Sequence, residues 1–253
     1  MKTTQRLDKV LGHMGYGSRS ELRRLVKAKG ITVNGRTVSD SGQQVNPYED
    51  LIEVNGERVV YKEFIYIMLN KPAGVISATE DTRDRTVIDL LEPDHRQFEP
   101  FPVGRLDKDT EGLLLLTNDG KLAHNLLSPR KHVPKMYFAE VLGLVDAADA
   151  EAFARGVRLD DGYVTMPAEL VVLSRSEEGS KPVSKIELTI MEGKFHQVKR
   201  MFEAVGKKVL YLKRMSMGPL LLDDHLQPGE SRELTHEELE ALQAHQEGKV
   251  ATV

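Results

Sequence analysis

The chain has 253 residues, which is more than one average domain of about 150 residues, so we expect one small and one larger domain. Apolar residues make up 40% and charged residues 29%, which excludes global disorder, and the absence of cysteine excludes disulfides and cysteine-ligated metals and suits a reducing cytoplasm. The net charge of −4 excludes a uniformly basic nucleic-acid binder, and no apolar run approaches the roughly 20 residues of a membrane span, so we expect a soluble cytoplasmic protein without membrane contact.

Two helices are predicted in the first thirty residues. Apolar residues recur at helical spacing from Leu7 to Met14. Ser18 and Glu21 then form a capping box, which predicts a second helix from Arg19 to Lys29 with Gly30 as its left-handed cap. Basic residues are left outside the apolar stripe of this second helix: Arg19, Arg23, Arg24, Lys27 and Lys29.

Two Asn-Gly pairs predict short β-hairpins after these helices. Asn34-Gly35 lies between the strand-like segments 31–33 and 37–38, and Asn55-Gly56 lies within segment 51–60. We therefore expect a small α/β domain over residues 1–60, followed by a linker over residues 61–64.

The remaining chain is predicted to form a mixed α+β domain with a mainly antiparallel sheet, over residues 65–243. Strand-like apolar runs cover residues 64–69, 112–116, 137–142 and 186–190, and helical patterns cover residues 146–155 and 196–205. Residues 223–247 are acidic and are expected to be solvated, with one helix near residues 237–245 and a tail over residues 244–253.

The segment from Val103 to Gly112 is the most unusual in the chain, because charged residues crowd into a loop before an apolar strand. A carboxylate there, such as Asp107, lies at the edge of the core, where it is partly desolvated. Alternate acidic residues in this loop also resemble the start of a calcium-binding loop, but Asn118 stands where the bidentate glutamate should be. We therefore expect no metal site.

Several motifs in order resemble the pseudouridine synthases of the RsuA family, with matches over nearly the whole chain. The motif at residues 104–107, with Asp109-Thr110 and Gly112-Leu113, resembles the family's catalytic signature. Further matches lie at residues 69–74, 128–130, 135–137 and 192–201. The first domain is similar to the S4 RNA-binding module at residues 6–9, 18–19 and 33–35.

The resemblance implies a role for each residue of the catalytic domain. Asp107 would be the catalytic aspartate, Tyr137 would pack on the target base, and Lys199 would be the basic partner of Asp107. Leu212 would form an apolar pocket floor, while Arg105 would either pair with a carboxylate or fill the gap left by the flipped base. Lysine at 199, where many members have arginine, matches the RsuA branch.

Basic residues are expected to meet RNA phosphates. In the S4-like module the candidates are Arg6, Lys9, Arg19, Arg23, Arg24, Lys27 and Lys29. In the catalytic domain Lys194 and Arg200 are candidate substrate-binding residues within a basic segment that also contains Lys199, Lys207, Lys208, Lys213 and Arg214. His196 and Gln197 are expected to order a loop and are assigned no catalytic role.

The implied reaction breaks the N1–C1′ bond of a uridine, turns the uracil and rejoins it through C5, so no cofactor is needed. A carboxylate can serve as general base or as nucleophile, and both routes stay open. The expected substrate is one uridine of 16S rRNA, presented by rRNA or a partly assembled small ribosomal subunit to a monomeric enzyme. The alternatives are a 23S rRNA enzyme of a sister branch and an RNA-binding ribosome assembly factor.

Overall fold

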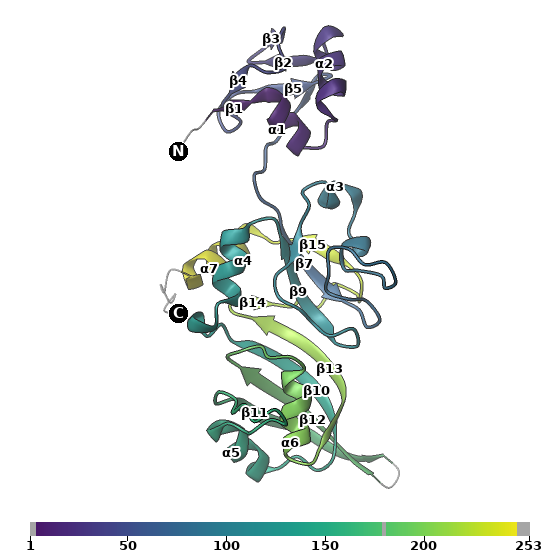
Figure 1. Cartoon of the computed structure of the whole chain (residues 1–253), viewed down its shortest axis with the longest axis vertical. Helices are drawn as coiled ribbons and strands as arrows, with labels where there is room; N and C mark the ends of the chain where they lie inside the picture. Colours follow the sequence, from purple (N-terminus) through teal and green to yellow (C-terminus); the bar gives the residue numbers. More distant parts are fainter. Residues whose placement is uncertain (1–3, 179–180, 247–253) are drawn as a thin grey trace. The chain divides into compact units, whose positions relative to one another are not determined.

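The structure is a computed structural model that describes residues 4–178 and 181–246. The chain divides into two compact units, one formed by residues 1–65 and 92–99 and the other by residues 66–91 and 100–253. Figure 1 shows that each unit is built around its own β-structure. Residues 247–253 of the predicted tail lie outside the described part of the chain. No helix within the described residues is long and apolar enough to cross a membrane.

The first unit joins three helices to short antiparallel strands. Its elements are β1 (Gln5–Arg6), α1 (Leu7–His13), α2 (Arg19–Lys27), β2 (Ile31–Val33), β3 (Arg36–Thr37), β4 (Gln44–Val45), β5 (Ile52–Val54), β6 (Glu57–Arg58) and α3 (Pro93–Arg96). The strand order is β3-β2-β5-β6 in one sheet, and β1 pairs with β4 in another. Asn34 and Asn55 have φ angles of 52° and 54°, which confirms both predicted hairpin turns.

Helix α2 begins as predicted and ends differently. Ser18 and Glu21 form the capping box. The left-handed residue at the other end is Lys29 (φ 59°), so the prediction of Gly30 was wrong. The Lys29 and Gly30 amides donate to the carbonyls of Val26 and Leu25, a Schellman arrangement that moves the turn one residue earlier. A Cβ at Gly30 would lie 2.6 Å from Asn55 Oδ1, so a larger residue there would have to displace the Asn55 side chain.

The segment 92–99 groups with the first unit, although the sequence placed all of residues 65–243 in one domain. Phe98 is 6% exposed, and its ring meets His13 edge-on with 5.3 Å between ring centroids. An aromatic contact with α1 therefore assigns this segment to the core of the first unit.

The second unit is an α+β structure around one nine-stranded mixed sheet, as predicted. Its strands are β7 (Tyr66–Lys71), β8 (Phe101–Pro102), β9 (Glu111–Thr117), β10 (Lys135–Leu142), β11 (Glu169–Glu178), β12 (Lys181–Ile190), β13 (Lys208–Met217), β14 (Leu220–Leu221) and β15 (Ser231–Glu233). The strand order is β11-β12-β10-β13-β9-β7-β15, with β8 paired to β9 and β14 to β13. Only the β9–β13 pair is parallel within the described sheet.

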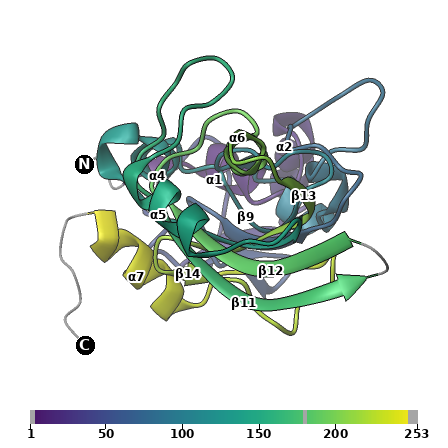
Figure 2. The same ribbon diagram turned by 90° about the horizontal axis from the view of Figure 1, so that it is seen from below.

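Four helices cover this sheet: α4 (Gly120–Leu127), α5 (Ala147–Arg155), α6 (Gln197–Ala204) and α7 (His236–Gln246). Figure 2 shows α5 and α6 on the same side of the β11–β12 hairpin, where Phe153 meets Phe202 with 5.1 Å between ring centroids. Helices α4 and α7 supply Leu122, Leu126 and Leu242 to a core shared with β7 and β9. The helices predicted over 146–155 and 196–205 are confirmed within one residue, whereas α4 and β11 were not predicted.

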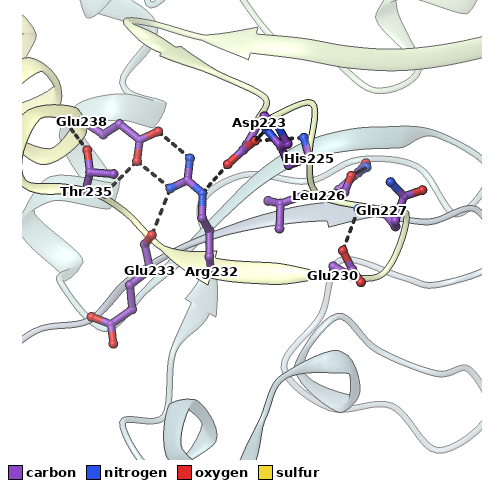
Figure 3. Close-up of polar contacts among 10 residues, drawn as sticks. Asp223, His225, Leu226, Gln227, Glu230, Arg232, Glu233, Thr235 and Glu238 are labelled. Carbon is purple, nitrogen blue, oxygen red and sulfur yellow. Dashed lines mark hydrogen bonds and ion pairs between the residues drawn. The ribbon is translucent and has the colours of Figure 1, made fainter.

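The acidic segment after residue 223 packs onto the sheet, although most of its acidic side chains are exposed as expected and the helix predicted near residues 237–245 is confirmed as α7. Strand β15 pairs with β7, and Leu242 of α7 is fully buried. Figure 3 shows how Arg232 links these elements, because its guanidinium binds Asp223 at 2.6 Å and both oxygens of Glu238 at 2.8 Å. Asp223 and Glu238 therefore pair with an arginine inside the segment and help to hold β15 and α7 at the edge of the sheet.

Candidate active site

One pocket of the second unit is formed by the loop 104–110, strands β10 and β13, and the segment 193–199. Six residues predicted from the sequence line it together: Arg105, Asp107, Tyr137, Lys194, Lys199 and Leu212. They come from segments that lie far apart in the chain, from Arg105 to Leu212. The fold thus brings residues from separate sequence motifs together around Asp107.

The loop that carries Asp107 is anchored from beneath by two buried side chains. Ser77 Oγ donates to the Leu106 carbonyl at 2.9 Å and accepts from the Leu106 amide at 3.0 Å. Lys71 is fully buried, and its Nζ donates to the carbonyls of Lys108 and Thr110 at 3.3 and 2.8 Å. Burial lowers the pKa of Lys71 to about 8. Removing this ammonium from water costs free energy, and the hydrogen bonds to the two carbonyls offset that cost and fix the loop.

Gly112 allows the loop to join the sheet beside the pocket. Its φ is 101°, and an added Cβ would lie 2.2 Å from the carbonyl oxygen of Arg214. Arg214 is its register partner in the parallel β9–β13 pair. Only glycine can allow this close approach of two backbones.

Asp107 faces a lysine that two carboxylates share. Lys199 Nζ lies 3.1 Å from Asp107 Oδ2 and 2.6 Å from Asp109 Oδ1. Burial opposes the charge on Lys199, but its hydrogen bonds to Asp109 and Asp107 outweigh this effect and raise its pKa. The same contact holds the pKa of Asp109 below its usual range. Lys199 therefore stays protonated beside Asp107 at neutral pH.

Tyr137 and Leu212 reach the pocket from adjacent strands. Side chains alternate along a strand, and Tyr137 and Ala139 of β10 are buried on the same face as Leu212 and Arg214 of β13. Tyr137 pairs in register with Arg214, and Ala139 pairs with Leu212. The pocket wall is thus an aromatic ring beside an aliphatic side chain, which suits a flat ring.

The segment before α6 is held by buried polar groups. Gln197 is 4% exposed, accepts from the Lys194 amide at 2.8 Å and donates to Glu192 Oε1 at 2.8 Å. Glu192 also accepts from the Tyr163 hydroxyl at 2.6 Å. His196 lies at φ 49°, with its Nε2 3.5 Å from Asp107 Oδ1. From the sequence we expected His196 and Gln197 only to order a loop. The structure shows that His196 also contacts Asp107.

Two further cations that line the pocket, Lys135 and Arg214, were not predicted as catalytic or substrate-binding residues. Lys135 donates to the Val133 carbonyl at 2.9 Å, and burial, followed by the charge of Arg214, lowers the pKa of Lys135 to about 8. Arg214 is 2% exposed and donates to the Leu113 carbonyl at 2.8 Å. The sequence could have indicated them, because Lys135 lies two residues before Tyr137 and Arg214 two residues after Leu212. Residues two apart in a strand lie on the same face of the sheet.

Other candidates lie outside the pocket. Arg200 does not line it; its guanidinium pairs with Asp160 and Asp161 and donates to the Phe195 carbonyl at 3.3 Å. In the first unit Arg6 is bound by Asp8 at 2.7 Å. The remaining RNA-binding candidates there are exposed: Lys9, Arg19, Arg23, Arg24, Lys27 and Lys29. Asp109 and Lys71 were not predicted as site residues, although both lie within motifs that resemble the family.

Comparisons with known proteins agree with this geometry. Residues 65–204 match the RNA pseudouridylate synthase family, and residues 5–51 match the S4 domain. The chain is 53% identical to an uncharacterised RNA pseudouridine synthase of Bacillus subtilis, covering 94% of this chain and 98% of that protein. It is 42% identical to ribosomal large subunit pseudouridine synthase B of the same organism, covering 95% and 96%. It is 39% identical to ribosomal small subunit pseudouridine synthase A of Vibrio cholerae, covering 94% and 99%.

These matches span both units, and the family match contains Asp107, Tyr137 and Lys199. Six of the residues predicted for the site meet in one pocket around that aspartate. The chain therefore belongs to the RNA pseudouridine synthase family, with an S4 domain before its catalytic domain.

Proposed function

We propose that the protein isomerises a uridine of ribosomal RNA to pseudouridine, with Asp107 as the catalytic residue. The observation that carries this proposal is the Asp107–Lys199 ion pair, 3.1 Å long, in a pocket walled by Tyr137 and Leu212. The carboxylate of Asp107 faces the ammonium of Lys199 across this distance. An ionised carboxylate is the group that either route of the reaction requires.

In the first route Asp107 removes a ribose proton as general base, and in the second it attacks carbon as a nucleophile. Both routes detach the uracil, which must turn while it stays in the pocket. Tyr137 and Leu212 flank a flat ring without fixing its rotation by hydrogen bonds to its edge. The reaction adds no atom and changes no oxidation state, so these residues supply its chemistry without a cofactor.

The target uridine has to leave its stack before Asp107 can reach it. Extruding a base costs a few kcal/mol, and stacking on an aromatic ring returns about 1–3 kcal/mol. Tyr137 is placed to provide that ring. Arg105 is exposed in the pocket lining, where it can enter the gap left in the RNA.

The exposed cations of α2 anchor the RNA through its phosphates in this proposal. Such contacts position a nucleic acid without reading its sequence. The catalytic unit contributes Lys194, which also lies 4.6 Å from the centre of the Tyr163 ring. We propose a monomeric enzyme that works in the cytoplasm on rRNA or on a partly assembled small subunit.

The proposed substrate is 16S rRNA. Two relatives of this chain come from Bacillus subtilis, and the chain is 53% identical to the uncharacterised one and 42% identical to the large-subunit enzyme. The chain is thus more similar to the uncharacterised protein than to the large-subunit enzyme of that organism. The lysine at position 199, which the sequence resemblance links to the RsuA branch, supports the same substrate.

Pseudouridine mapping tests the proposal. Unmodified 16S and 23S transcripts and partly assembled subunits are incubated with wild-type protein and with Asp107→Asn. A single site in 16S rRNA that only the wild type modifies is the expected result. A site in 23S rRNA would support the large-subunit alternative. The absence of any site on all substrates would instead favour an RNA-binding assembly factor.

A further inference from the structure

Phe195 is the most exposed of the large hydrophobic side chains in the described part of the chain. Its side chain is 75% exposed, although it lies directly before a residue of the pocket lining. One face of its ring is covered by the His196 imidazole, with 3.8 Å between ring centroids and 18° between ring planes. The two rings form a parallel stack whose outer face is open.

The backbone beneath this stack is fixed on both sides. Gln197 ties the Lys194 amide to buried Glu192, and Arg200 donates to the Phe195 carbonyl at 3.3 Å. Ion pairs with Asp160 and Asp161 hold the guanidinium of Arg200 in place. An exposed aromatic ring on a loop held in this way loses little freedom when a ligand stacks on it.

The stack is continuous with the catalytic pocket. His196 Nε2 lies 3.5 Å from Asp107 Oδ1, so the imidazole contacts the catalytic carboxylate and supports the Phe195 ring. Phe195 is one ring further from Asp107 than the pocket lining. A flat ligand on its open face would therefore be a neighbour of the group in the pocket, not the reacting group itself.

We propose that Phe195, supported by His196, is a stacking platform for an unpaired RNA base adjacent to the target uridine. This inference rests on the proposed function and adds a second base contact to it. Every base has a π-face, so stacking on Phe195 tolerates different sequences and holds the RNA strand in its opened conformation. Phe195 is thus a positioning residue, while Asp107 remains the catalytic one.

Fluorescence tests the contact without requiring turnover. The chain contains no tryptophan, so Phe195→Trp in the Asp107→Asn background introduces a single indole at the platform. Leu144→Trp is the matched control, because Leu144 is 53% exposed beyond the end of β10 remote from Tyr137. The probes are a single-stranded RNA of mixed sequence and an abasic ribose-phosphate chain of the same length.

We expect the mixed RNA to quench the tryptophan at position 195, the abasic chain to leave it unquenched, and neither to affect the tryptophan at position 144. Equal quenching by the two probes, or none by the RNA, would overturn the proposal. The abasic chain separates stacking from simple attraction of phosphates to the protein.

Kinetics test the role on the rRNA that the wild type modifies. Phe195→Ala and Phe195→Leu should each raise KM about tenfold with kcat within about twofold, because the contact binds ground state and transition state alike. Phe195→Tyr should restore KM toward the wild-type value, and equal thermal unfolding would show that the fold is intact. Unchanged KM in Phe195→Ala would refute the platform while leaving the proposed function in place; no modification by wild type would instead refute the function.

Discussion

Two regions of the molecule are rich in basic residues but differ in whether acidic side chains pair with those residues. The cations of α2 and its cap are all exposed, and no salt bridge within the described residues involves them: Arg19, Arg23, Arg24, Lys27 and Lys29. In the segment from α6 to β13, by contrast, Lys199 is paired with Asp107 and Asp109, Arg200 with Asp160 and Asp161, and Lys207 with Asp149. The cations of the first group are free to meet phosphates, whereas Lys199, Arg200 and Lys207 are held by carboxylates.

This comparison shows that a run of basic residues in a sequence does not establish an RNA-binding surface. Helix α2 is short, and its carboxylate Glu21 caps the helix by binding Ser18, so the helix leaves its cations unpaired. The segment from α6 to β13 lies inside a larger unit, where loops from other parts of the chain bring acidic side chains to it. The electrostatic potential at the surface of a segment is therefore set by tertiary contacts as well as by its own residues.

The largest effect should come from removing the carboxylate that we propose as catalytic, within the paired region. Asp107→Asn is expected to lower turnover by about 10³-fold or more, because neither route works without an ionised oxygen. Pseudouridine release from labelled rRNA measures the loss. Asp109→Asn is the matched control, since Asp109 binds the same lysine but is 72% exposed, and it should cost less than about tenfold. Activity above a few per cent in Asp107→Asn would contradict the assignment.

The free cations should act on binding. Replacing Arg23, Arg24 and Lys27 together by glutamine should weaken RNA affinity at least about tenfold and reduce the slope of log Kd against log salt by about 2. Filter binding over a range of salt concentrations gives both values. The control changes two exposed arginines of the same unit, Arg36→Gln and Arg58→Gln, which should alter the slope less. An unchanged slope in the triple variant would remove α2 from the RNA interface.

A paired cation should act on stability. Lys207→Met leaves Asp149, which is 5% exposed, without the ammonium that binds it at 2.7 Å. The expected loss is about 1–3 kcal/mol of the free energy of unfolding, measured by urea denaturation. Lys208→Met is the matched control, because Lys208 is exposed, and its effect should stay within about 0.5 kcal/mol. Equal losses in both variants would show that the pairing contributes nothing specific.

The smallest effect is expected for Arg200 in the salt titration. Its guanidinium is engaged by Asp160, Asp161 and the Phe195 carbonyl, so Arg200→Gln should leave the salt slope for RNA binding unchanged. The sequence placed this residue among those that bind substrate. A slope of log Kd against log salt reduced by about 1 would show that Arg200 binds a phosphate. The two basic regions would then not differ in this respect.

The sequence by itself determined the local elements and the nature of the site. Ser18 and Glu21 specify where α2 begins, and two Asn-Gly pairs specify the hairpins, because capping and turn geometry depend on adjacent residues. The motif around Asp107 identified the family for the same reason, since its residues are contiguous. Partners of Asp107 were found only because separate motifs resembled known ones.

Only the tertiary structure decided which charges are neutralised and which side chains support the site. Lys71 lies far from Asp107 in the sequence, yet its buried ammonium holds the loop that carries the aspartate. The acidic segment after residue 223 became part of the sheet through Arg232 and β15. Such outcomes depend on the pairing of distant strands, because a charged side chain is stable in the interior only where the fold brings it a partner.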